Sequence, residues 1–216
     1  MRTREAAMAL VLYNHDLLAD AYKVRLLLSL LGLPYESRTV AMLPGAGADA
    51  PAFRALSPAG TVPVLIDGDT VLTRPEAILI HLAERHDPAG RFLPGDGGAR
   101  AAVLDWLFFA AGDLRAAEAA RLKSLFGAAS AFADPYATAR TAFRLLEGHL
   151  VRQTLRGARF FVGDQATLAD LAIFPTVALA ADFGLGMEEF PRLLTWSRRL
   201  HALPGFITMS GVREMV

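Results

Sequence analysis

Arg74 is a candidate for holding a small acidic ligand. It precedes Pro75 and Glu76 at the predicted start of a helix, and its guanidinium can bind a carboxylate or a phosphate through two parallel hydrogen bonds. The alternative is a surface arginine paired with a nearby acid. Thr73 and Glu76 have the spacing of a capping box, which predicts that the Glu76 carboxylate bonds to the helix backbone.

A second group of candidate residues, Tyr13, Asn14 and His15, follows a predicted strand. These side chains offer a hydroxyl, an amide and an imidazole. The imidazole of His15 is attractive for catalysis because its ordinary pKa lies near neutrality. The alternative for His15 is a loop histidine that is only solvated.

Trp106, Phe109 and Asp113 have the i, i+3, i+7 spacing of one face of a predicted long helix. Core packing is an alternative for the two aromatic residues. Arg115 and Arg121 follow in the same region and could line the same cleft, but we expect them to be solvated.

The composition excludes several kinds of chemistry and several partners. The chain has 216 residues, no cysteine and a net charge of zero. Without cysteine there is no disulfide, thiolate nucleophile or cysteine-bound zinc, and the five histidines show no metal-ligand spacing. No basic half exists to bind phosphates, so we expect no nucleic-acid partner. Residues 1–12 resemble a signal peptide only weakly, and no apolar stretch approaches the length of a membrane span, so we expect a cytoplasmic protein.

The periodicity of apolar residues predicts a small α/β domain followed by an all-helical domain. Strands are predicted at 9–13, 35–40, 62–66 and 70–72. Helices are predicted between and after them at 19–31, 52–56 and 74–85, and then at 97–120, 134–156, 167–183 and 191–202. A segment rich in proline and glycine separates the two groups. We therefore predict domains at 1–86 and 97–216, joined by a linker at 87–96.

The order of these elements, together with several motifs, resembles the cytosolic glutathione transferase superfamily. The motifs are YKVRLLLSLLGLPYE from Tyr22, LSPAGTVPVL from Leu56, and the Thr167-x-x-Asp170 capping box. They are spread over most of the chain and resemble bacterial members of theta-, nu- or beta-like type. The resemblance implies a thioredoxin-like N-terminal domain and an all-α C-terminal helical bundle.

The resemblance also implies glutathione as cosubstrate, a small electrophile as second substrate, and a homodimer. Thr61, Val62 and Pro63 fall in the motif where the family holds a cis peptide bond before proline, which presents the Val62 backbone to the peptide ligand. The helix that carries Trp106 and Asp113 would border the acceptor pocket and the dimer interface.

The sequence departs from the family where the glutathione sulfur is held. Bacterial members usually place serine at the start of the first helix, and the aligned residue here is Leu18. The resemblance therefore leaves Tyr13, Asn14, His15 or the Leu18 backbone to serve the sulfur.

A second departure affects the γ-glutamyl end of glutathione. The family's Glu/Gln-Ser pair is replaced by Arg74 and Pro75, which removes an N–H and a hydroxyl and reverses a charge. Glu76 is then a candidate to receive the ligand's amino group.

These observations predict a glutathione transferase-like enzyme that conjugates, isomerises or dehalogenates an electrophile with glutathione or a related thiol. The alternative is a non-catalytic relative whose cleft holds a different, acidic ligand or a protein partner.

Overall fold

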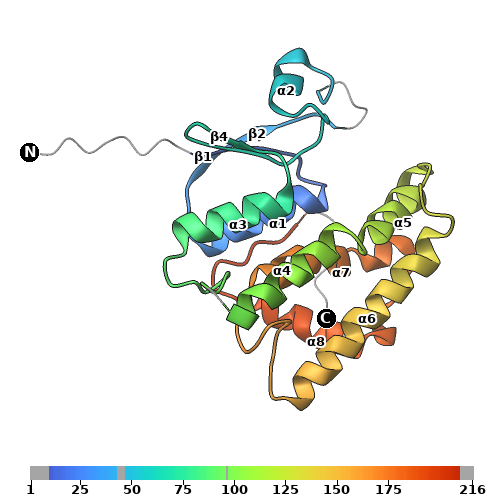
Figure 1. The fold of residues 1–216 in the computed structure, drawn as a ribbon. Helices are drawn as coiled ribbons and strands as arrows, with labels where there is room; N and C mark the ends of the chain where they lie inside the picture. The colour runs from blue at the N-terminus through green and yellow to red at the C-terminus, as the bar shows by residue number, and fades with distance from the viewer. Residues whose placement is uncertain (1–9, 43–46, 96, 210–216) are drawn as a thin grey trace, which may run out of the picture.

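The N-terminal part of the chain folds around a four-stranded mixed sheet (Figure 1). The computed structural model describes residues 10–42, 47–95 and 97–209. Strand β1 (Leu10–Asn14) pairs in parallel with β2 (Tyr35–Thr39) and antiparallel with β3 (Val64–Asp67). Strand β4 (Thr70–Leu72) pairs antiparallel with the other edge of β3, so the order is β2-β1-β3-β4.

Three helices accompany this sheet. Helices α1 (Ala19–Leu30) and α3 (Pro75–His86) lie on one side of it, and the short α2 (Pro51–Leu56) lies towards the other (Figure 1). Gly32 has a positive φ of 65°, a conformation that glycine adopts without steric cost, and the chain turns there into β2. This is the predicted thioredoxin-like domain.

The rest of the described chain is helical. It comprises α4 (Gly97–Ala111), α5 (Arg115–Phe126), α6 (Pro135–Leu155), α7 (Leu168–Ala178) and α8 (Pro191–His201), with short 3₁₀ helices at Ala180–Phe183 and Met187–Glu189. The fold class predicted from the sequence is confirmed.

Two predicted helices were too long. The helix expected over 97–120 is split between Ala111 and Arg115, where Gly112 weakens the helix because glycine has the greatest backbone freedom. The helix expected over 167–183 ends at Ala178, and the chain then tightens into a 3₁₀ helix, as is common at the C-terminal ends of helices.

One large core joins the sheet, α1 and α3 to the helical domain. Helix α7 is at its centre, packed against α1 and α4 and buried along almost its whole length. A smaller cluster of Val40, Phe53, Val62 and Val64 lies beside α2. The peptide bond between Val62 and Pro63 is cis, as expected.

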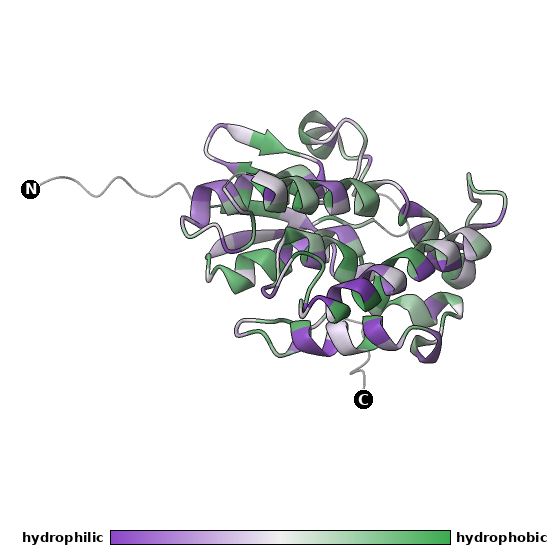
Figure 2. Ribbon diagram, turned by 60° about the horizontal axis from the view of Figure 1, so that its bottom comes forward, coloured by the Kyte–Doolittle hydropathy of each residue, from purple (hydrophilic) through white to green (hydrophobic). Residues whose placement is uncertain are grey.

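Within the described residues, no helix is long and apolar enough to cross a membrane. Figure 2 shows hydrophilic and hydrophobic residues interspersed along the helices. The segment compared with a signal peptide lies mostly in residues 1–9, outside the described residues, and both predicted domains extend beyond the described ranges at their outer ends.

Candidate functional site

A cavity of about 250 Å³ lies where the α/β domain meets the helical domain. The structure brings together in its wall five residues predicted to bind the cosubstrate: Thr61, Val62, Arg74, Pro75 and Glu76. The turn before β3 and the start of α3 supply these residues. They are adjacent because β3 and β4 form a hairpin that leads directly into α3.

Two groups in this wall are available to a ligand. The backbone of Val62 forms no hydrogen bond with another described residue, although its side chain is buried in the smaller cluster. The exposed guanidinium of Arg74 likewise forms no hydrogen bond or ion pair within the described part of the chain. The surface pairing considered for Arg74 is therefore not seen among these residues.

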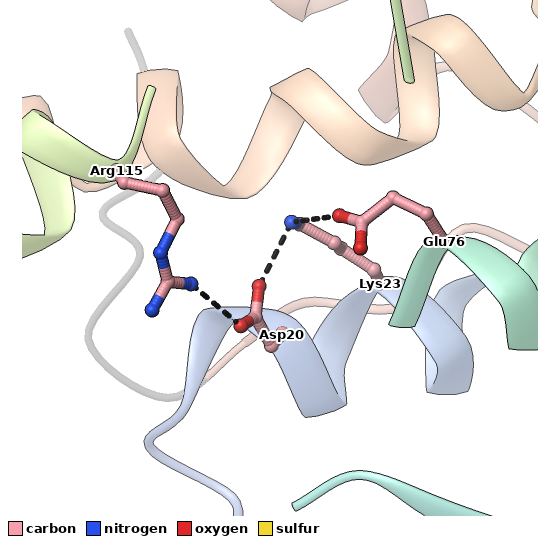
Figure 3. Close-up of polar contacts among 4 residues, drawn as sticks. All are labelled: Asp20, Lys23, Glu76 and Arg115. Atoms are coloured by element: carbon pink, nitrogen blue, oxygen red, sulfur yellow. Dashed lines mark hydrogen bonds and ion pairs between the residues drawn. The ribbon is translucent and has the colours of Figure 1, made fainter. Parts of the chain in front are cut away.

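Four charged side chains form a network at the same junction (Figure 3). The ammonium of Lys23 is buried and donates hydrogen bonds to Asp20 Oδ1 at 2.8 Å and to Glu76 Oε1 at 3.2 Å. Arg115, at the start of α5, donates to Asp20 Oδ2 at 3.1 Å. The network therefore links α1 to α3 and to the helical domain.

The capping box expected at the start of α3 is absent. Arg74 is the N-cap and no side chain caps the helix, so Glu76 stands at the second helical position, one short of the capping position. Its carboxylate instead accepts a hydrogen bond from Lys23. This charge-assisted bond is stronger than a neutral backbone contact.

The network sets the charges of its members. Burial acts to raise the pKa of Asp20, but Lys23 and then Arg115 outweigh it, and the net pKa is lowered. Burial opposes the charge of Lys23, but Asp20 and Glu76 together raise its pKa. Burial raises the pKa of the neighbouring Glu118. The buried Lys23 and the half-buried Asp20 are therefore held as an ion pair at the cavity.

The three candidate catalytic residues lie outside the wall of this cavity. The Asn14 side chain is buried, donates to Ser37 Oγ at 2.8 Å and accepts from Arg25 at 2.7 Å. The Tyr13 hydroxyl accepts from Arg38 at 2.8 Å. Each of these side chains therefore has a structural partner.

His15 and Leu18 lie in the turn before α1. The Nδ1 atom of His15 accepts a hydrogen bond from the Leu17 N–H at 3.2 Å. Leu18 is the N-cap of α1 and packs against the smaller hydrophobic cluster, and its N–H donates to the His15 carbonyl at 3.2 Å. Their part in holding a sulfur atom stays a prediction.

The predicted pocket face on α4 packs mainly inwards. The ring of Trp106 lies 5.2 Å from that of Phe109 and 4.8 Å from that of Phe161. Asp113 is exposed in the turn between α4 and α5. These contacts favour the core alternative for the two aromatic residues.

Sequence reasoning missed two residues of the site and predicted the wrong environment for Arg121, which lies outside it. Asp20 and Lys23 were not singled out, although their i, i+3 spacing with opposite charges is a signal for a helix-surface pair. Arg121 was expected to be solvated and is buried, because it forms an ion pair with Asp182 at 2.8 Å.

The described residues contain no group of three or more histidine, aspartate or glutamate side chains that could hold a metal ion.

Two family models match the chain. The N-terminal domain model of glutathione S-transferases matches residues 21–85, and the C-terminal domain model matches residues 129–199.

Similar proteins were found over nearly the whole chain. A probable maleylacetoacetate isomerase from Vibrio cholerae is 33% identical over 206 residues, which cover 92% of this chain and 94% of that protein. Glutathione S-transferase theta-2 from Mus musculus is 31% identical and covers 92% of this chain and 83% of its own length. A crystal structure of a glutathione S-transferase from Xanthobacter autotrophicus is 32% identical, with a TM-score of 0.81, and covers 94% of this chain and 98% of its own. The chain therefore belongs to the glutathione S-transferase family.

Proposed function

We propose that this protein is a glutathione-dependent transferase that acts on a small electrophile. The observation that carries the proposal is the cavity at the domain junction, where the unpaired Val62 backbone lies in the same wall as Arg74 and Glu76. An extended peptide can pair with a free backbone unit as it would with a strand edge. The charged side chains beside it suit a ligand with carboxylate and ammonium groups.

We propose that Arg74 takes over the binding of a glutathione carboxylate. The side chain is free of partners in the described structure, and its forked guanidinium matches a carboxylate. It thereby replaces the N–H and hydroxyl that are missing at Pro75. The Glu76 carboxylate, which accepts from Lys23 through one oxygen only, is the proposed partner of the ligand's ammonium group.

The start of α1 is the proposed place of the sulfur. The positive end of a helix dipole lowers the pKa of a nearby thiol and so favours the reactive thiolate. Leu18 offers no hydroxyl there, so Tyr13, Asn14 and His15 remain the proposed donors. Each would have to leave or share its present hydrogen-bond partner.

The proposed reaction is conjugation of an electrophile or thiol-assisted isomerisation. The Vibrio cholerae relative is named as a probable isomerase and the mouse relative as a transferase. Both reaction types need an activated thiol. We also propose a cytoplasmic location and a homodimer, as the family resemblance implies.

Isothermal titration with glutathione tests this proposal. We expect binding to the wild-type protein and a loss of about tenfold or more in Arg74→Gln, because one charge-assisted hydrogen bond contributes about 1.5–3 kcal/mol. Arg144→Gln is the matched control, since Arg144 is exposed on α6 and does not line the cavity. Turnover of a generic aryl halide with glutathione should accompany binding.

Two results would count against the proposal. Unchanged affinity in Arg74→Gln would remove Arg74 from the binding site. No binding of glutathione at millimolar concentration, with binding of a small dicarboxylate instead, would favour the non-catalytic alternative.

A further inference from the structure

Helix α6 lies at the outside of the helical domain and packs on α5 and α8 (Figure 1). Its exposed side combines aliphatic and basic side chains, which fall on one face because an α-helix has 3.6 residues per turn. We call this the outer face of α6, and it consists of Arg144, Leu145, Val151, Arg152, Leu155 and the C-cap Arg156.

The aliphatic side chains of the outer face are open to solvent. Leu145 is 55% exposed, Leu155 is 82% exposed, and Val151 is exposed as well. Val151 and Leu155 are four residues apart, so they are neighbours on the helix surface. Apolar side chains that gather on one exposed face, rather than being scattered singly, point to an interaction with something outside the chain.

The arginines of the outer face carry charge that is not neutralised. Within the described residues, the side chains of Arg144, Arg152 and Arg156 form no hydrogen bond or ion pair. Burial lowers the pKa of His149, on the inner side of the helix, and the charges of Arg152 and Arg156 lower it further. The positive charge of this face therefore acts even across the helix.

The acids nearest to the outer face are engaged elsewhere. Glu147 is the one acid within α6, and it accepts a hydrogen bond from the Arg192 N–H at the start of α8, at 2.9 Å. Glu189 pairs with Arg140 at 3.0 Å. Asp134 caps the far end of the helix. The outer face is therefore positive, although the whole chain has a net charge of zero.

This combination of groups suits an anionic lipid surface. Guanidinium groups bind phosphates through paired hydrogen bonds. Leucine side chains beside them can enter the boundary between the head groups and the acyl chains. A protein partner is less well matched, because the side chains that dominate a protein interface are bound in pockets and the exposed side of a single helix is convex.

We propose that the outer face of α6 docks the protein on a membrane that contains anionic phospholipids. The helix axis would lie along the membrane surface, with the aliphatic side chains towards the acyl chains and the three arginines at the lipid phosphates. This contact needs no membrane-spanning helix. It is separate from glutathione binding, because no residue of the outer face lines the cavity at the domain junction.

Vesicle co-sedimentation of the full chain tests the proposal. We expect binding to vesicles of equimolar phosphatidylcholine and phosphatidylglycerol, and little binding to phosphatidylcholine alone. The triple variant Arg144→Gln/Arg152→Gln/Arg156→Gln should weaken this binding on the order of a hundredfold, about fivefold for each basic residue removed from the membrane surface. Added salt should weaken the binding of the wild-type protein, because it screens the attraction.

The matched control removes the same charge from the other domain. Arg38→Gln/Arg54→Gln/Arg85→Gln changes three exposed arginines of the α/β domain and should leave vesicle binding close to the wild-type level. Circular dichroism melting checks that each variant is folded. Equal losses in the two triple variants would show that only net charge matters, and would overturn the proposal.

A fluorescent variant locates the contact. Leu155→Trp places an indole at the end of the outer face, whereas the two native tryptophans, Trp106 and Trp196, pack in the core. We expect anionic vesicles to shift its emission to the blue, and lipids with brominated acyl chains to quench it. The wild-type protein should show neither change. Leu155→Ser should weaken vesicle binding, because it removes the apolar part of the contact.

Three further results would overturn the proposal. The first is no binding of the wild-type protein to the anionic vesicles. The second is vesicle binding that leaves the emission of Leu155→Trp unchanged, which would place the contact on another face. The third is an emission shift of Leu155→Trp that depends on protein concentration without vesicles, which would assign the outer face to a second copy of the chain.

Discussion

At the scale of single residues, Asp20 is the centre of the candidate site. One carboxylate oxygen accepts from Lys23 and the other from Arg115, which comes from the other domain. Asp20 also lies in the first turn of α1, where the helix dipole favours a negative charge. Three positive influences therefore keep this half-buried carboxylate ionised.

We expect Asp20→Asn to lower the free energy of unfolding by about 2 kcal/mol at neutral pH, because hydrogen bonds to charged groups contribute about 1.5–3 kcal/mol. The pKa of Asp20 is lowered in the folded state, so its contribution is fully present above the unfolded value near 4. The contribution is lost as the pH falls through the folded pKa. Urea unfolding at a series of pH values should show the two proteins converging below about pH 4.

Asp113→Asn provides the control for this measurement. Asp113 is exposed and outside the network, so its variant should change the unfolding free energy by less than about 0.5 kcal/mol. A difference between wild type and Asp20→Asn that stays constant down to the lowest pH would contradict the role given to the Asp20 charge.

At the scale of elements, the start of α7 holds the helical domain together. Asp170 is fully buried and accepts hydrogen bonds from the Thr167 N–H at 2.8 Å, the Phe161 N–H at 3.0 Å and the Trp196 indole at 2.7 Å. Burial raises its pKa, and these donors oppose the rise. One side chain thereby fixes the loop before α7, the cap of α7 and helix α8.

We expect Asp170→Ala to destabilise the protein by at least about 3 kcal/mol, since each buried donor left unsatisfied costs about 1–3 kcal/mol. The matched variant Asp134→Ala removes the exposed N-cap of α6 and should cost about 1 kcal/mol. Chemical denaturation of both variants compares the two caps. Equal losses of unfolding free energy in the two variants would show that burial of the groups that donate to Asp170 adds nothing to stability.

At the scale of the whole molecule, the two domains share one core, while some large apolar side chains remain outside it. Phe108 on α4 is 75% exposed and Leu155 at the end of α6 is 82% exposed. Aromatic side chains contribute strongly to protein interfaces. Phe108, on the helix that the family resemblance places at the dimer interface, is therefore a candidate contact of the proposed homodimer.

We expect Phe108→Glu to raise the dimer dissociation constant at least about thirtyfold, which corresponds to the loss of about 2 kcal/mol at an interface hot spot. Leu155→Glu should have no effect on the dimer. Sedimentation analysis over a range of concentrations measures both. A Phe108→Glu protein that stays as dimeric as the wild type would place the interface elsewhere.

The sequence was sufficient for most of the fold because its signals are local. Several of these signals depend only on residues that are near one another in the sequence. They are the hairpin of the third and fourth strands, the proline and glycine at the helix ends, and the Thr167–Asp170 cap. The break at Gly112 was missed because alanine-rich segments on both sides favour a helix. A single glycine does not reveal whether tertiary contacts will end a helix.

The candidate site was only partly predictable. Thr61, Val62, Arg74 and Glu76 were found through a motif, and the structure brings them to one cavity. The partners of Glu76 and Arg121 lie 53 and 61 residues away in the chain, and no local pattern announces such pairs. The pairing of these charged side chains could therefore be seen only in the structure.

Asp20 bonds to both Lys23 and Arg115, and this affects how the two domains respond when a ligand binds in the cavity. Arg115 both lines the cavity and fastens α5 to α1 through Asp20. A ligand whose acidic group binds Arg115 must compete with the Asp20 carboxylate. The Arg115 guanidinium can therefore bind either the ligand or Asp20. An acidic ligand in the cavity should weaken the contact between α5 and α1, and a ligand without an acidic group should leave it intact.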